Sequence, residues 1–418
     1  MGSELQLDKK VTRLIEKGVQ IPNPFSVEIG SDVEIERIAG NGVVLYPGTR
    51  IHGKKTLIGS GSKIGSETPA TLIDCLTGCN VELRGGFFKD SLFLDRVSIG
   101  SGAQIREGCI LEEESGGNHT IGLKQTILFP YVTLGSLINF CDCFMAGGTD
   151  RKNHSEIGSS FIHFNYTPNQ DKATPSLIGD VPRGVMLDQS PIFLGGQGGI
   201  VGPIRIGYGT VTAAGSVIRQ DCPEGGKILV EKTSSGGNKS FKPGYYPDIK
   251  KRVINNVYFL ANLLALKEWY SQIRHRFLEM REFGEPLCQA GLELIRAAIE
   301  ERLKRFHDLS EKMRYSVSIQ ESEAQVPETA LLQKREFIEK WPEIEVCFRD
   351  GSEEQIGLED RDSFIREIWE KMEFVEGDYL NTIRKLNPEI KAHGTAWLQA
   401  IVDHVIRRVQ NVVPSFDI

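Results

Sequence analysis

Residues 193–218 read FLGGQGGIVGPIRIGYGTVTAAGSVI, and within this stretch an aliphatic or β-branched residue returns at every sixth position. The repeating positions are Leu194, Ile200, Ile206, Thr212 and Ile218. An amphipathic helix would repeat every 3.6 residues and a half-buried strand every second residue, so neither produces this spacing. A period of six is typical of a solenoid in which each repeat is one short strand followed by a tight corner.

The same step of six occurs through much of the first half of the chain. Further pairs are Ile29 and Ile35, Leu45 and Ile51, Ile58 and Ile64, and Ile99 and Ile105. A glycine often follows the aliphatic residue, as in Ile58-Gly59 and Ile206-Gly207, and glycine fits a crowded corner because it lacks a Cβ. Three such repeats form one coil, and stacked coils bury a ladder of aliphatic side chains. The sequence therefore predicts a hexapeptide solenoid, a parallel β-helix, over residues 27–231.

Composition and charge exclude several classes of protein. The chain has 418 residues, of which 40% are hydrophobic and 25% charged, as in ordinary globular proteins. Its net charge of −7 argues against a general nucleic-acid binder, which needs a basic surplus. No segment reaches the roughly 20 apolar residues that span a bilayer. The eight cysteines include no CxxC pair, so we expect reduced thiols in a cytoplasmic protein and no metal site.

The composition changes along the chain and predicts four segments. Residues 1–26 form an N-terminal helical cap with Val11, Leu14 and Ile15 on one face, and the β-helix follows over residues 27–231. Residues 232–247 are rich in Ser, Gly and Pro and read as a linker. Residues 248–418 are predicted to be an α-helical domain for packing or oligomerisation, with shorter helices near 328–341, 360–374 and 395–411. Its two long apolar stripes are Ile249, Val253, Val257, Leu260, Leu264, Ile273, Phe277 and Met280, and then Leu292, Ile295, Ile299, Leu303, Phe306 and Leu309.

Three stretches interrupt the period of six, namely residues 112–120, 146–155 and 164–176. Such stretches are expected to leave the prism as loops. Because function commonly resides on loops that a rigid scaffold carries, we expect functional residues in these stretches.

The sequence of residues 156–221 resembles the acetyltransferase domain of the bifunctional UDP-N-acetylglucosamine pyrophosphorylase family, which belongs to the hexapeptide-repeat acyltransferases. The motifs that carry the resemblance are Asn165-Tyr166, Lys172, Ile178-Gly179-Asp180 and Ala213-Ala214-Gly215. The resemblance implies a mainly β fold, a left-handed parallel β-helix, to which an α-helical C-terminal domain is added. It also implies a homotrimer, with sites between neighbouring prisms.

The resemblance further implies an acyl-CoA-dependent transferase, with acetyl-CoA or another acyl-CoA as donor and an amino-sugar phosphate or sugar nucleotide as acceptor. Asn165 and Tyr166 would contact the sugar and Lys172 its phosphate. Gly196 and Ala214 would offer backbone groups to the acyl-CoA arm. Lys232 would meet the phosphates of the cofactor.

Several features depart from the family pattern. The family's general base is a histidine before the Asn-Tyr pair, and here His154 is the first candidate and His163 the second. In the family, basic residues early in the domain bind the phosphates of the sugar nucleotide. The matching run here, residues 127–144, contains no Arg or Lys, so Arg151, Lys152 and Arg183 are the candidate phosphate ligands. With only residues 1–26 before the coils, pyrophosphorylase activity is not expected.

Two other readings remain open. A non-catalytic protein that binds a sugar nucleotide or acts as a scaffold would keep the fold and Asn165-Tyr166, and the added helical region favours an interaction role. A metal-dependent lyase on a β-helix would need three converging histidines, and the candidates considered for it are His119, His154 and His163.

Overall fold

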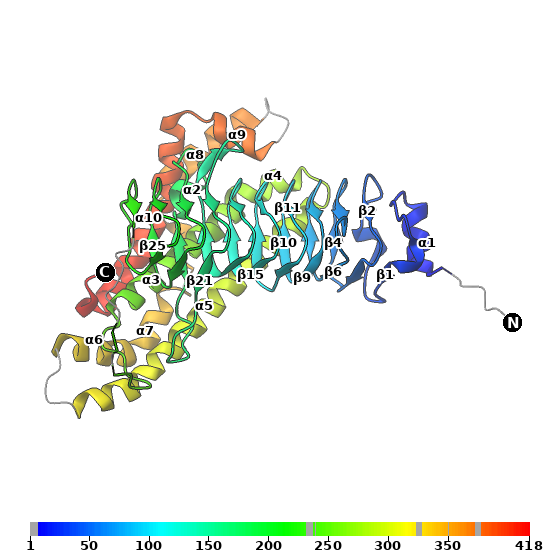
Figure 1. Ribbon diagram of the computed structural model, residues 1–418. Coiled ribbons are helices and arrows are strands. Elements are labelled where there is room, and N and C mark those ends of the chain that lie inside the picture. Colours follow the sequence, from blue (N-terminus) through cyan, green and yellow to red (C-terminus); the bar gives the residue numbers. More distant parts are fainter. Residues whose placement is uncertain (1–6, 231–236, 239, 323–327, 350, 373–377) are drawn as a thin grey trace.

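The computed structural model describes residues 7–230, 237–238, 240–322, 328–349, 351–372 and 378–418. Helix α1 (Lys9–Glu16) lies at the N-terminal end of a long β-structure (Figure 1). The Asp8 side chain accepts hydrogen bonds from two backbone N–H groups of its first turn, which is the usual way to satisfy a helix start. Val11 and Leu14 face the coils, whereas Ile15, predicted on the same face, is 40% exposed.

Successive coils stack in parallel and create three faces. Face A is one ten-stranded sheet. Its strands are β2 (Val44–Leu45), β5 (Lys63–Ile64), β8 (Glu82–Leu83), β11 (Ser98–Ile99), β14 (Gly116–Gly117), β16 (Thr133–Leu134), β20 (Glu156–Ile157), β23 (Phe193–Leu194), β26 (Val211–Thr212) and β28 (Ile228–Leu229).

The other two faces belong to one sixteen-stranded sheet, because β15 (Ile121–Leu128) and β17 (Ile138–Met145) run round the corner that joins them. The first halves of these two strands lie on face B, with β1 (Glu28–Ile29), β3 (Arg50–His52), β6 (Ala70–Ile73), β9 (Gly86–Lys89), β12 (Ala103–Ile105), β21 (Ile162–Phe164), β24 (Gly199–Val201) and β27 (Val217–Ile218). Their second halves lie on face C, with β4 (Leu57–Ile58), β7 (Leu76–Thr77), β10 (Ser91–Phe93), β13 (Cys109–Leu111), β22 (Ser176–Ile178) and β25 (Arg205–Ile206). The chain passes through the faces in the order A, B, C.

The predicted six-residue ladder forms the core of the prism. Every aliphatic or β-branched position named from the period, from Ile29 to Ile218, is at most 7% exposed. The hexapeptide prediction and the fold class are therefore confirmed: a parallel β-helix followed by a helical region. All eight cysteines are free thiols, and all except Cys79 are buried.

The corner between faces B and C has an unusual backbone. Asp74, Asp90, Gln125 and Asp142 occupy this corner in different coils with positive φ angles of 51°, 42°, 50° and 58°. Aspartate tolerates this conformation better than most residues because its short polar side chain bonds locally. The column of polar side chains at this corner leads to the candidate site described below.

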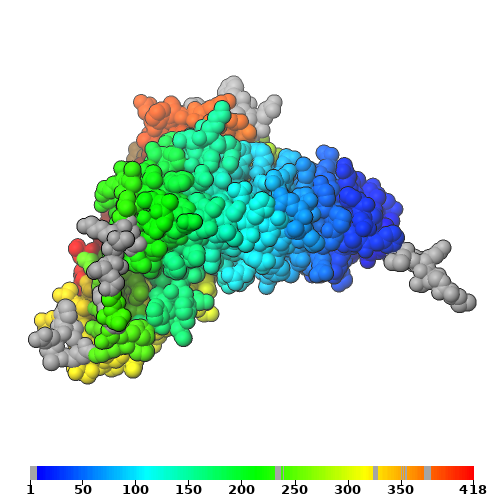
Figure 2. All heavy atoms as spheres, viewed as in Figure 1, coloured from blue at the N-terminus to red at the C-terminus, as the bar shows by residue number. Residues whose placement is uncertain are grey.

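The rest of the chain is helical, and its longest helix lies against face C. The elements are α2 (Val181–Gly184), α3 (Lys250–Trp269), a π-helical turn (Tyr270–Arg274), α4 (His275–Glu279), α5 (Gly284–Glu321), α6 (Glu328–Glu339), α7 (Trp341–Val346), α8 (Leu358–Met372), α9 (Tyr379–Lys385) and α10 (Pro388–Val412), with 3-10 turns at Pro24–Ser26, Ile35–Arg37, Ser352–Gln355 and Pro414–Phe416. Helix α5 contacts β7, β10 and β13 of face C. In the space-filling view, yellow and orange atoms of the helical region border the green atoms of the last coils, at the end of the molecule away from the N-terminus (Figure 2).

The helical predictions agree with the structure except at their ends. The stripe predicted to end at Met280 ends earlier, because Met280 is 58% exposed beyond the end of α4. Helix α10 begins at Pro388, before the predicted 395, because Asn387 caps it and proline suits its first turn. Among the described helices, none is long and apolar enough to cross a bilayer. Within the predicted linker, residues 232–236 and 239 lie outside the described residues, as does residue 231 before it, and Tyr246 is buried.

Buried charges join the helices to the coils. Arg274 is fully buried and donates from Nη2 to Oε1 of Glu113 at 2.7 Å. Beside it, the Tyr270 hydroxyl donates to Oε1 of Glu112 at 2.7 Å. Burial raises the pKa of Glu112 to about 7. A buried ion pair of this kind contributes little net stability while intact, but removing one partner leaves a charge without compensation.

Replacing Arg274 should therefore destabilise the fold strongly. We expect Arg274→Met to lower the free energy of unfolding by about 3–5 kcal/mol, because Glu113 then stays buried without its partner. The double variant Arg274→Met/Glu113→Leu should recover much of this loss. Urea titrations would measure both, with Arg314→Met, an exposed position on α5, as a control that changes little. Equal stability of Arg274→Met and the wild type would contradict the prediction.

The raised pKa of Glu112 predicts a pH dependence of stability. Its pKa rises from 4.5 to about 7 on folding, so between these values the folded chain holds a proton that the unfolded chain releases. The free energy of unfolding should accordingly fall as the pH rises from about 4.5 to 7. In Glu112→Gln, whose amide oxygen can still accept from Tyr270, this decline should be smaller. Urea midpoints across this interval would test it, and identical pH profiles for both proteins would count against it.

Candidate functional site

Asn165, Tyr166 and Lys172, which the sequence singles out, line one cavity of about 250 Å³ at the B/C corner. The loop 165–175, which connects β21 on face B to β22 on face C, carries all three. The Thr174 hydroxyl donates to the carbonyl oxygen of Asn165 at 2.7 Å and closes the loop on itself. We call this space the loop cavity.

A buried carboxylate lies at the centre of the loop cavity. Asp142 accepts a hydrogen bond from the side-chain amide of Asn165 and pairs through Oδ1 with Nη2 of Arg302 at 2.7 Å. Both Asp142 and Arg302 are more than nine-tenths buried. The orientation of Asn165 is therefore fixed by a pair that spans the β-helix and helix α5.

The helical region holds the loop in place at several further points. Lys312 on α5 donates to the carbonyl oxygens of Asn169 and Gln170 at 2.7 and 2.8 Å. The Tyr246 hydroxyl donates to Asp171 at 3.0 Å, and the Asn256 amide on α3 donates to the carbonyl of Ala173 at 3.0 Å. The loop that carries the candidate substrate residues is thus fixed by side chains that lie far away in the sequence.

The first candidate base, His154, lies at another corner. It belongs to the hairpin of β18 (Gly148–Asp150) and β19 (Asn153–His154), which projects where face C turns into face A. Its Nδ1 is buried and has no hydrogen-bond partner among the residues that the structure describes. Within one chain, His154 does not line the loop cavity.

The two candidate phosphate ligands on the same hairpin, Arg151 and Lys152, also lie away from the loop cavity. Arg151 donates to the carbonyl oxygens of Glu114 and Tyr131 at 2.8 and 3.0 Å, and it lines a separate hollow of about 460 Å³ on face A. Lys152 is exposed to solvent. Neither residue lines the loop cavity in this chain.

The second candidate base, His163, lies inside the prism. Its side chain is 1% exposed, and Nε2 lies 2.7 Å from the Ser176 hydroxyl. Burial lowers the pKa of this histidine to about 4, so its ring is neutral at ordinary pH. A general base must reach the substrate, and this burial leaves His154 as the candidate that we retain.

Gly196 and Ala214 meet at the third corner, between faces A and B. They lie in consecutive coils, and the Gly215 N–H donates to the carbonyl oxygen of Gly196 at 2.9 Å. Glycine is required next to them, because a Cβ at Gly195 would come within 2.6 Å of the Ala214 backbone nitrogen. Lys232, the remaining candidate for acyl-CoA binding, lies outside the described residues.

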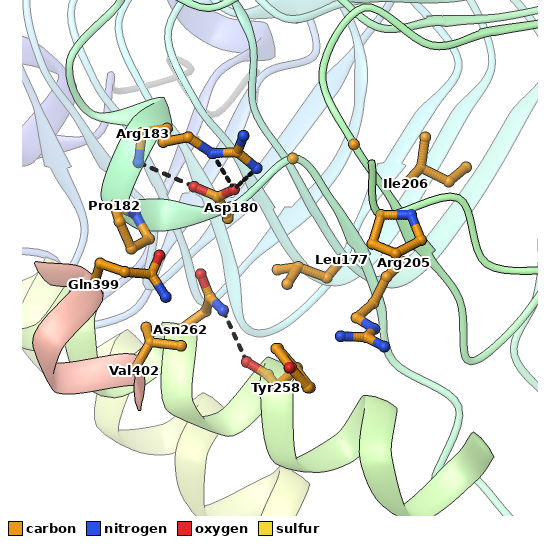
Figure 3. Close-up of a pocket in the computed structure, with 13 residues that line it drawn as sticks. Leu177, Asp180, Pro182, Arg183, Arg205, Ile206, Tyr258, Asn262, Gln399 and Val402 are labelled. Atoms are coloured by element: carbon orange, nitrogen blue, oxygen red, sulfur yellow. Dashed lines mark hydrogen bonds and ion pairs between the residues drawn. The ribbon is translucent and has the colours of Figure 1, made fainter. Parts of the chain in front are cut away.

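Arg183 lines a different cavity, of about 190 Å³, between the last coils and helices α2, α3 and α10 (Figure 3). Its guanidinium binds the Asp180 carboxylate, with Nε 2.8 Å from Oδ2. On the far side of this cavity, Arg205 stacks over the ring of Tyr258 at 3.9 Å. Arg183 is therefore engaged by its neighbour and does not serve the loop cavity.

The structure does not bring the three candidate histidines of a lyase together. Within the described ranges, one group of three metal-capable side chains converges, and it consists of His275, Glu279 and Glu285. These are partly or fully exposed on the helical region. The group includes none of the coil histidines, so the geometry gives no support to the lyase reading.

Sequence reasoning missed four cations that line the loop cavity. These are Arg106 and Lys124 from the coils and Arg302 and Arg305 from α5. One signal was present: Arg302 stands three residues after Ile299 and four before Phe306, on the buried stripe of the helix. A charged residue on an apolar stripe indicates a buried partner.

No protein-family model matches the chain. Among curated proteins it is similar to the bifunctional protein GlmU of Thermotoga maritima, with 32% identity over 216 residues, 51% of this chain and 43% of that protein. GlmU of Fervidobacterium nodosum is 30% identical over 215 residues, 50% of this chain and 42% of the relative. GlmU of Carboxydothermus hydrogenoformans is 28% identical over 231 residues, which are 55% of this chain and 46% of the relative. The chain thus spans less than half the length of these relatives.

The similarities of the chain to solved structures are low. LpxA from Acinetobacter baumannii matches 52% of this chain and 70% of its own at 14% identity, with a TM-score of 0.22. An Arabidopsis UDP-N-acetylglucosamine acyltransferase gives 12% identity and a TM-score of 0.16 over the same shares. These scores are too low to support an argument. From its period of six, its stacked parallel coils and its curated relatives, the chain is a hexapeptide-repeat β-helix protein that resembles the acetyltransferase domain of GlmU.

Proposed function

We propose that this protein is an acyl-CoA-dependent transferase that acts on an amino-sugar phosphate or a sugar nucleotide. The observation that carries the proposal is the loop cavity, where Asn165, Tyr166 and Lys172 line one polar space together with further cations. The similarity to GlmU supports the same class of reaction. Acetyl-CoA is the proposed donor, and the enzyme is proposed to work in the cytoplasm without a metal.

The proposed step is direct acyl transfer. The amino nitrogen of the sugar attacks the thioester carbonyl carbon, a new C–N bond forms and the C–S bond breaks. A base takes one proton from the nitrogen, and the sulfur leaves as the CoA thiol. His154 is the proposed base, and backbone groups at Gly196 and Ala214 are proposed to hold the acyl-CoA arm.

This assignment requires more than one copy of the chain. The loop cavity, His154 and the Gly196–Ala214 pair lie at three different corners of one prism. Residues at different corners point away from one another, so a single prism cannot surround one small ligand with all of them. We therefore propose a homotrimer, in which a corner of one prism faces a different corner of its neighbour.

One observation favours the alternative, a non-catalytic protein that binds a sugar nucleotide or acts as a scaffold. A catalytic histidine is usually oriented by a hydrogen bond at its second nitrogen. Within the described residues, Nδ1 of His154 has no such partner. In this alternative the loop cavity binds a ligand and no acyl transfer takes place.

Thermal denaturation with ligands separates the two functions. A ligand at about 100 times its dissociation constant should stabilise the folded chain by about 2.7 kcal/mol. We expect stabilisation by acetyl-CoA and by glucosamine 1-phosphate if the protein is a transferase, followed by acetyl transfer measured as thiol release. Stabilisation by UDP-N-acetylglucosamine alone, without thiol release, would favour the binding protein.

The role of His154 gives a direct kinetic prediction. His154→Ala should lower kcat about a hundredfold or more, because a general base contributes at least that much. The oligomeric state should not change, as sedimentation would show. His393→Ala, an exposed histidine on α10, is the matched control and should retain full turnover. An unchanged kcat in His154→Ala would remove this residue from the mechanism.

A further inference from the structure

Five cationic side chains from both halves of the chain line the loop cavity. Arg106, Lys124 and Lys172 come from the coils and their loop, and Arg302 and Arg305 come from α5. The carboxylates that line the same cavity are Asp142 and Glu301. Cations outnumber carboxylates here although the whole chain carries a net charge of −7.

Arg302 and Arg305 differ in what they bind. The Arg302 guanidinium is 3% exposed and is committed to Asp142 at 2.7 Å. Arg305 is 27% exposed, donates from Nε to Glu301 at 2.8 Å and lies 3.3 Å from Asp308 through Nη1. Its Nη2 has no hydrogen-bond acceptor among the described residues. Arg305 therefore keeps a donor for a ligand and is partly exposed, whereas Arg302 is buried against Asp142 and donates from Nη1 to the carbonyl oxygen of Lys172 at 3.5 Å.

Lys172 is another cation that remains available. Of the two coil cations, Lys124 pairs with Glu107, and Arg106 is exposed and forms no ion pair among the described residues. The Lys172 side chain is exposed, and within the described ranges its ammonium forms no ion pair. Its backbone is fixed, because its neighbours Asp171 and Ala173 are bonded to Tyr246 and Asn256. A fixed loop loses little conformational entropy when a ligand binds.

We propose that helix α5 forms one wall of the substrate site and that Arg305, together with Lys172, binds a phosphoryl group in the loop cavity. Arg302 is a positioning residue, because it neutralises Asp142 and so prevents that carboxylate from repelling the anion. Guanidinium groups suit phosphoryl oxygens because their donors are planar and always charged. The proposal rests on the proposed function for the sugar part of the ligand only, since the phosphoryl recognition follows from the charges themselves.

The proposal also accounts for a gap in the coils. Residues 127–144 contain no Arg or Lys, so the cations that the coils contribute to this cavity, Arg106 and Lys124, precede that run. Helix α5 supplies cations at the same corner from a position 130 residues along the chain from Lys172. Phosphoryl recognition needs positive charge near the oxygens and does not depend on where in the sequence that charge arises.

The test is calorimetric titration of the full chain at fixed ionic strength with inorganic pyrophosphate, glucosamine 1-phosphate and coenzyme A. Arg305→Gln should weaken binding of at least one of these probes about tenfold or more, which is typical for loss of a charge-assisted hydrogen bond. Arg314→Gln is the matched control, because Arg314 lies on the same helix, also pairs with a glutamate, and does not line the cavity. It should bind as the wild type does.

The positioning role of Arg302 has its own readout. Arg302→Met should weaken binding of the same probe, because the charge of Asp142 is then uncovered. Adding Asp142→Asn removes the uncovered charge and should restore the affinity, and the comparison counts only between variants that are folded to the same extent during the titration. Circular dichroism melting would show that each variant is folded at the temperature of the titration.

The outcomes separate this proposal from the proposed function. Loss of affinity in Arg305→Gln supports it even if the wild type transfers no acyl group, and that result would overturn the transferase alone. An effect confined to coenzyme A assigns the phosphoryl group to the donor, and one confined to glucosamine 1-phosphate assigns it to the acceptor. A wild type that binds none of the probes, or an Arg305→Gln variant that binds them unchanged, overturns the proposal.

Discussion

Parallel stacking of coils is the constraint on which the rest of this structure depends. Each strand pairs in register with its counterpart in the next coil, as in Ile121 with Ile138 and Gly122 with Asn139. Equivalent positions therefore form columns parallel to the long axis, and an inserted loop leaves the prism only at a corner. The loop 165–175 leaves at the B/C corner, directly beside the polar column that ends at Asp142. The position of the candidate site is thus a consequence of where one insertion falls in the coil.

The helical region places a buried arginine at each edge of face C, Arg302 at the B/C corner and Arg274 at the C/A corner. Burying Asp142 or Glu113 under helices would be costly without a partner, and Arg302 and Arg274 supply the partners. The two pairs attach the helical region to the coils at separate places, and Lys312 adds bonds to the loop backbone. Because the same contacts hold the helices and order the loop, the fold of the second half and the geometry of the site are not independent properties. A helical region predicted only for packing or oligomerisation is in this structure part of the cavity wall.

The sequence predicted the solenoid well because its signal is local and repeated. One buried residue in every six fixes the strand positions, and Leu194, Ile200 and Ile206 are buried as expected. Asn165, Tyr166 and Lys172 do line one cavity, since one short loop carries them, and their role as substrate ligands stays a prediction. The position of His154 relative to that loop was not predictable, because the period does not count residues that leave the prism, and its role as the base stays a prediction. Arg305 could not be predicted as a cavity residue for a different reason. It lines the same cavity as Lys172 because of how a 38-residue helix packs against the coils, and no local sequence pattern encodes that packing.

The distribution of exposed apolar side chains bears on how three corners could act together. Helices of the same chain cover part of face C, so that face is less available to a neighbour. Three large apolar side chains stay exposed around the A/B corner and its adjoining strands, namely Leu137, Ile162 and Phe193, and a fourth, Phe164, is exposed at the B/C end of β21. The A/B corner is the one that presents Gly196 and Ala214. An exposed apolar cluster of this kind commonly marks a protein contact, and it favours the proposed trimer over a working monomer. A neighbouring chain at this corner would enclose the groups proposed to bind acyl-CoA. The loop cavity and the cations proposed to bind the phosphoryl group belong to a single chain. Binding of the acyl donor would therefore depend on trimer assembly, whereas binding of the anion would depend on helix α5.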